Sequence, residues 1–94
     1  MFSYKSSRWQ KKRAHILKRD GYLCRESLRY GKRIAADTVH HIYPVKDYPQ
    51  YAMCDWNLIS LSCKMHEKMH DRESGELTAQ GLNLQRRHPI PPQK

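Results

Sequence analysis

The sequence predicts a small α+β domain, and three observations lead to this class. Its 94 residues leave room for one domain only. Residues 7–19 have the spacing of an amphipathic helix, with Trp9, Ile16 and Leu17 on one stripe. Two short apolar segments, 38–43 and 56–61, precede a second helical segment, which gives the order strand, loop, strand, helix.

The first helix has recognisable boundaries in the sequence. Ser6 or Ser7 can cap its start, and Asp20, which is followed by glycine, is typical of its end. The next stretch, residues 22–36, begins with an apolar run and contains the glycine of a turn. We therefore expect this stretch to be extended, with one tight reversal.

Turn residues and caps divide the strand–loop–strand–helix segment. Pro44 is expected to end the first strand. Residues 45–55 contain tyrosines and a proline without any period, which predicts a loop that packs on itself. Ser62 is a suitable cap for a helix that runs from Cys63 to about Arg72.

The C-terminal part is expected to contain one more helix and a tail. The helix should begin at Thr78. Three leucines are expected to pack it against the domain, namely Leu77, Leu82 and Leu84. Residues 86–94 are basic and contain prolines, which predicts an extended tail. The expected organisation is one domain over residues 1–85, with its core motif at 38–71, and the tail 86–94.

The charge of the chain points to a polyanionic partner. Eighteen Lys and Arg stand against nine Asp and Glu, so the formal net charge is +9 and the pI is near 9.8. Nucleic acid is the commonest ligand of such a surface, although a merely soluble basic protein would have the same composition. The chain has no apolar run that could cross a bilayer, and its first residues do not resemble a signal peptide.

The cysteines favour a reducing compartment. Cys24, Cys54 and Cys63 are odd in number and scattered along the chain. This pattern is typical of reduced thiols rather than of a disulfide framework. We therefore expect a soluble, cytoplasmic protein.

Four of the six histidines lie in the segment 39–71. His66 and His70 are four residues apart and would share a helix face, so they can hold one ion between them. The tandem pair His40-His41 has to be brought to them by the fold. Three imidazoles can hold a divalent ion and leave coordination positions open, as in catalytic sites, and a fourth imidazole can then act as a base.

Consecutive residues of a strand point to opposite faces, so His40 and His41 are expected to divide the work between metal binding and proton transfer. Which of the two is the ligand stays open at this point, because register at a strand end slips easily. Cys63, one turn before His66, is an alternative fourth ligand that would close the site. A small residue at the start of a helix is the simpler interpretation of this cysteine.

The spacing of His40-His41, Asn57, His66 and His70 resembles that of the HNH endonucleases, which have a beta-beta-alpha-metal fold. The ligand pattern is similar to that of the colicin-type DNases within this family. The resemblance implies that His41 is the general base, and that His40, His66 and His70 hold the metal. It also implies that Asn57 braces the loop between the strands, so that His41 is correctly aimed.

Many members of the family bind a second, structural zinc through two Cys-x2-Cys pairs. Here the first pair reads Cys24 and Ser27, and the second is replaced by Ser62 and Met65. One cysteine of four cannot bind zinc tetrahedrally, so we expect no structural zinc. At the catalytic site an all-nitrogen ligand set favours zinc as the bound ion, whereas Mg, Mn or Ni stay open as the ion that supports turnover.

The sequence therefore predicts a metal-dependent HNH endonuclease that nicks or cuts double-stranded DNA. The small size and Leu77-Thr78 are similar to phage-encoded members, which implies phage DNA processing or packaging in the host cytoplasm, beside a large terminase subunit. The alternative is a non-catalytic DNA-binding module with a structural metal site, and either would be a monomer or a homodimer. Candidate contacts with DNA phosphates are basic side chains. They are Arg8, Lys11, Lys12, Lys46, Lys64 and Lys68.

Overall fold

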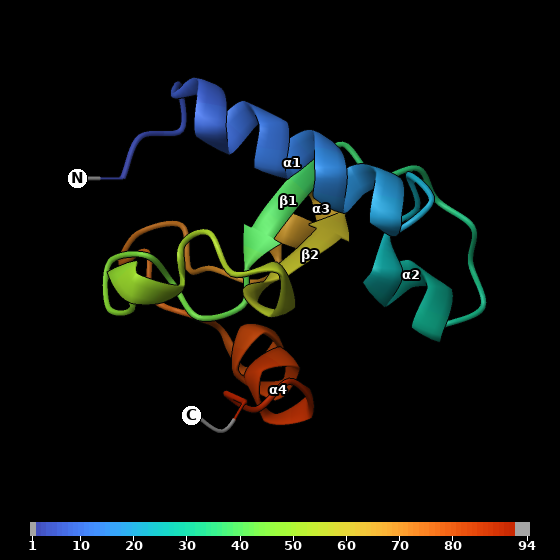
Figure 1. Ribbon diagram of the computed structural model, residues 1–94. Helices are drawn as coiled ribbons and strands as arrows, with labels where there is room; N and C mark the ends of the chain where they lie inside the picture. Colours follow the sequence, from blue (N-terminus) through green and yellow to red (C-terminus); the bar gives the residue numbers. More distant parts are fainter. Residues whose placement is uncertain (1, 92–94) are drawn as a thin grey trace.

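A two-stranded antiparallel sheet lies at the centre of the computed structural model, which describes residues 2–91 (Figure 1). Its strands are β1 (Thr38–His41) and β2 (Leu58–Leu61). The register pairs His40 with Ile59 and His41 with Leu58. Both strands were expected, and both are two residues shorter than their apolar segments.

Helix α1 (Ser7–Arg19) crosses one face of the sheet, as Figure 1 shows. The Ser6 side chain accepts a hydrogen bond from the backbone N–H of Trp9, so the predicted cap and helix are confirmed. The helix and this face of the sheet together form the α1-side core, which consists of Trp9, Ile16, Leu17, Val39 and Leu58.

The opposite face of the sheet is covered by α3 (Cys63–Glu67), whereas α4 (Ala79–Arg87) lies below the sheet in the view of Figure 1. Here lies the α3-side core, which consists of Cys24, Ile42, Tyr43, Ile59, Leu61, Met69 and Leu84. The two strands thus separate two small cores, because successive residues of a strand face opposite ways. The α+β class with an N-terminal helix is as predicted.

The stretch 22–36 is not simply extended, as expected, because it contains helix α2 (Arg25–Arg29). The expected reversal is present: Leu23 and Ala35 form an antiparallel bridge, and Gly31 has φ of +78° in the turn. The helix forms inside this loop because Glu26 and Ser27 are buried there, and a non-local contact with Arg87 binds the Glu26 carboxylate.

The helix that begins after Ser62 ends at Glu67 and not near Arg72, so this expectation was wrong. The Ser62 side chain caps its start as predicted, by accepting from the N–H of Met65. After Glu67 the chain turns away, because Thr78 binds two backbone carbonyls there. Its hydroxyl donates to the carbonyl of Lys68 at 2.6 Å, and its N–H donates to that of Met69 at 2.9 Å.

The C-terminal region also departs from expectation in two details. Leu84 is fully buried, but Leu82 is 43% exposed and belongs to neither core. Helix α4 continues through Arg86 and Arg87, so the basic tail cannot begin at residue 86. The expected tail residues 92–94 lie outside the described part of the chain.

The expected loop between the strands contains two short 3-10 helices, η1 (Pro49–Tyr51) and η2 (Asp55–Asn57). Among residues 2–91, no helix combines the length and apolar character needed to cross a membrane.

Candidate metal centre

Three histidines from β1, α3 and the segment after it meet on one side of the sheet. One ring nitrogen from each of His40, His66 and His70 lies within 4.8 Å of the others. The ring centroids are 5.1 Å apart for His40 and His66, 5.3 Å for His40 and His70, and 5.6 Å for His66 and His70. This spacing allows one ion to contact all three rings.

His40 has the features of a metal ligand. The residue is 1% exposed, and neither its Nδ1 nor its Nε2 has a hydrogen-bond partner among the described residues. Burial, with the charges of His66, His70 and His41, holds the pKa of His40 well below its usual 6.5. The ring is therefore neutral at pH 7, and a buried lone pair without a partner suits a metal ligand.

His70 belongs to the cluster, but the element that positions it is not the predicted helix. It lies beyond α3, in an isolated antiparallel bridge with Leu77, so a shared helix face does not place it. Its Nδ1 is 3.2 Å from the carbonyl oxygen of Gly75, an acceptor, so Nδ1 carries the proton and Nε2 is free for an ion. A backbone carbonyl that orients a ligating imidazole in this way is common in metal sites.

His41 faces the opposite side of the sheet, towards α1. Its Nε2 donates to the carbonyl oxygen of Ala52 at 3.0 Å, which leaves the lone pair on Nδ1. Burial lowers the pKa of His41, and the charge of His66 lowers it further. The hydrogen bond to Ala52 raises the pKa, but the net shift is downward. The ring is thus neutral at pH 7 and can accept a proton.

Asn57 is fully buried and ties the loop to the end of the first strand. Its Oδ1 accepts from the N–H of Tyr43 at 2.7 Å. Its Nδ2 donates to the carbonyls of Tyr43 and Tyr51, each at 3.1 Å. Because Tyr51 precedes Ala52, the same side chain fixes the carbonyl that orients His41.

The histidines line a cleft of about 820 Å³. Of the six basic residues predicted to contact DNA, only Lys46 lines it. Lys64 and Lys68 line a separate groove, and Lys12 is paired with Asp55. Arg8 and Lys11 are exposed on α1 and do not line the cleft.

Arg13 is a cleft residue that the sequence did not single out. It lines the cleft from α1, and its Nη2 donates to the carbonyl of Asp37 at 2.6 Å. The signal was its position four residues after Trp9, which places both on one side of the helix.

The cysteines lie outside the histidine cluster. Cys63, the alternative fourth ligand, is exposed and lines the separate groove. The Sγ of Cys24 is buried and accepts from the Ser27 hydroxyl at 3.2 Å. Among residues 2–91, the group of side chains that could hold a metal consists of the three histidines.

Comparison with known proteins agrees with this geometry. No protein-family profile and no curated protein matches the sequence. A solved structure does match, that of the HNH endonuclease of the deep-sea thermophilic bacteriophage GVE2 with a manganese ion. It is 33% identical, covers 68% of this chain and 70% of its own, and superposes with a TM-score of 0.66. The chain belongs to the HNH endonuclease family.

Proposed function

We propose that this protein is a metal-dependent endonuclease that hydrolyses phosphodiester bonds in DNA. The observation that carries the proposal is the buried His40, which has no hydrogen-bond partner among the described residues and lines one cleft together with His66 and His70. His40, His66 and His70 would hold the divalent ion. When bound, the ion supplies positive charge to the phosphate oxygens and to the leaving 3'-oxygen.

The remaining residues divide the other tasks. His41 accepts a proton from water at Nδ1 while the water oxygen bonds to phosphorus and the bond to the 3'-oxygen breaks. Asn57 positions His41 through the loop, as described above. Arg13 and Lys46 line the cleft and are placed to bind phosphate oxygens of the substrate. The net charge of +9 supports a nucleic-acid substrate.

The ion that supports turnover is a matter for experiment. Three nitrogen donors favour zinc, nickel, cobalt or manganese over magnesium. The GVE2 relative was solved with manganese, which supports manganese as the first ion to try. Zinc would then be a tight but less active occupant.

The test is cleavage of supercoiled plasmid by wild type and His41→Ala with a panel of divalent ions. We expect His41→Ala to keep the bound metal and to lose cleavage by roughly 10²-fold to 10⁴-fold, because it removes the base but no ligand. His15→Ala is the matched control: this histidine is exposed, is not in the cleft, and its loss should leave cleavage unchanged.

Two outcomes would contradict the proposal. One is a wild-type protein that binds DNA but cuts it with none of the ions, which favours a DNA-binding module with a structural metal. The other is loss of metal from His41→Ala, which would make His41 a ligand that closes the site.

We further propose a role in phage DNA processing, supported by the phage origin of the GVE2 relative. Such a nuclease would act in the host cytoplasm, and a large terminase subunit would be its partner. Co-purification of the two proteins from infected cells would test this. Absence of the complex while both are expressed would count against it.

A further inference from the structure

His41 lies against a wall of three aromatic rings from the N-terminal segment and α1. The aromatic wall consists of Phe2, Tyr4 and Trp9. The Trp9 ring stacks on the His41 ring, with centroids 5.0 Å apart and planes at 20°. Phe2 and Tyr4 meet the same imidazole edge-on, at 5.4 Å and 89° and at 6.1 Å and 75°.

The three rings of the wall also pack on one another, although Tyr4 is 58% exposed. Trp9 is 3% exposed and belongs to the α1-side core. Phe2 and Tyr4 pack edge-to-face on Trp9 and on each other, with centroids 4.8 to 5.8 Å apart. Gln10 donates to the carbonyl of Tyr4 at 2.7 Å and anchors the N-terminal segment on α1. The indole is thus buried and packed between the His41 ring and the rings of Phe2 and Tyr4, which restricts its orientation.

The hydrogen bond to Ala52 does not fix the His41 ring by itself. The torsion that turns a histidine ring about its Cβ–Cγ bond has a broad energy profile. The Ala52 carbonyl fixes the direction of Nε2, but a second contact is needed to fix the plane of the ring. The lone pair of Nδ1 lies in this plane, so the plane decides whether the lone pair points at the attacking water.

We propose that Trp9 is a positioning residue, which sets the plane of the His41 ring by stacking and so aims Nδ1 into the cleft. The inference rests on the proposed function of His41 as general base. It assigns to the N-terminal segment and the first turns of α1 a place in the active site. It also explains why an indole, and not an aliphatic side chain, occupies this place in the core.

The test compares Trp9→Leu, Trp9→Phe and Leu17→Ala in single-turnover and steady-state cleavage. Leu17 is the matched control, because it belongs to the same helix and core but is not part of the aromatic wall. We expect Trp9→Leu to lower kcat by about 10-fold to 100-fold, with KM and metal affinity unchanged. Trp9→Phe, which restores an aromatic ring, should recover most of this loss, and Leu17→Ala should keep the wild-type kcat below its melting temperature.

Two kinetic results would overturn the proposal. If Leu17→Ala loses as much kcat as Trp9→Leu, the effect is one of general stability. If Trp9→Phe is as impaired as Trp9→Leu, ring stacking is not what matters.

An NMR measurement on the zinc-bound wild-type protein keeps the proposal testable if Trp9→Leu does not fold. A stacked indole should shift the His41 ring protons upfield, and the ring nitrogens should show the proton on Nε2; ring protons at ordinary shifts would refute the stack. A protein with the shifted signals that cuts no DNA would refute the nuclease proposal alone. A protein that cuts DNA with a kcat indifferent to Trp9 would refute the positioning alone.

Discussion

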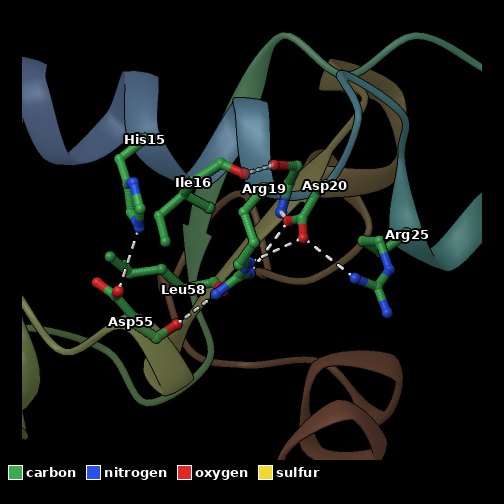
Figure 2. Close-up of polar contacts among 8 residues, drawn as sticks. His15, Ile16, Arg19, Asp20, Arg25, Asp55 and Leu58 are labelled. Carbon is green, nitrogen blue, oxygen red and sulfur yellow. Dashed lines mark hydrogen bonds and ion pairs between the residues drawn. The ribbon is translucent and has the colours of Figure 1, made fainter.

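The Asp20 carboxylate joins α1 to the second strand, and its replacement by asparagine gives the sharpest test of what holds the scaffold together (Figure 2). The side chain is fully buried and accepts four hydrogen bonds. Arg19 donates two of them at 2.9 and 3.1 Å, and Arg25 donates one at 3.1 Å. The fourth comes from the backbone N–H of Ser60 in β2, at 3.0 Å.

Asp20→Asn keeps the shape of the side chain but replaces one acceptor oxygen by a donor. Whichever way the amide turns, its NH₂ group then faces either the Ser60 N–H or the guanidinium groups. A hydrogen bond to a charged group contributes about 1.5–3 kcal/mol, and a buried unsatisfied donor costs about 1–3 kcal/mol. Both arginines are partly exposed, so solvent screening reduces the contribution of their hydrogen bonds to stability. We therefore expect a loss of about 2–4 kcal/mol in the free energy of unfolding.

The assay is urea unfolding followed by circular dichroism, at a fixed excess of metal. Asp55→Asn is the matched control, since this carboxylate also binds a basic residue of α1, Lys12, but its side chain is 48% exposed. An exposed pair of this kind contributes about 0–1 kcal/mol. Equal losses in the two variants would refute the argument that burial makes the Asp20 contacts important.

Acid should remove the difference between wild type and Asp20→Asn. Burial alone would raise the pKa of Asp20, but the hydrogen bonds from Arg19 and Ser60 outweigh it, so the pKa lies below the usual 3.8. A depressed pKa gives stability that is fully present above the unfolded-state value and is lost as the pH falls through the folded-state value. The gap between the two proteins should therefore be constant near neutral pH and shrink below about pH 4. A gap that persists unchanged at lower pH would contradict this assignment.

Three further predictions concern the site and the segment that supports it. Metal at 100 times its Kd should stabilise the protein by about 2.7 kcal/mol, seen as a rise in Tm on the order of 10–20 °C, and His66→Ala should lose this rise in a melting scan. Asn57→Ala should lower the free energy of unfolding by about 2–4 kcal/mol in urea, because it leaves the N–H of Tyr43 buried without its acceptor. Gly81→Ala places a Cβ 2.6 Å from the backbone oxygen of Met69, so it should cost about 1–3 kcal/mol although alanine is the better helix former, and a Tm at or above wild type would contradict this.

What the sequence predicted well is what depends on local interactions. Helix α1 has its cap and its apolar stripe within one continuous segment. That His40 and His41 face opposite sides of the sheet follows from the alternation of side chains along a strand. Helix α2 was missed because its surroundings are non-local: Glu26 is held by Arg87, which is 61 residues away in the chain. The helix propensity of residues 25–29 alone cannot predict such a contact.

The pair His66 and His70 shows how a correct grouping can follow from a wrong local structure. Their spacing of four residues predicted closeness through a continuous helix, and the ring centroids are indeed 5.6 Å apart. The helix, however, ends at Glu67, because Thr78 takes up the carbonyls that a longer helix would have used. The competing partner lies ten residues downstream, beyond the reach of a periodicity argument.

This geometry makes α4 a support of the candidate metal centre, although none of its residues is in the histidine cluster. His70 is held by a bridge to Leu77 and by the carbonyl of Gly75, and both depend on the turn that Thr78 closes. Thr78 in turn caps α4, by accepting from the N–H of Gly81. An ion that binds His70 would bind only while the Thr78 turn is formed. Because a ligand stabilises the conformation that it binds, the ion would also stabilise the packing of α4 on the domain. For a domain with two small cores, the metal is thus expected to contribute to folding as well as to catalysis.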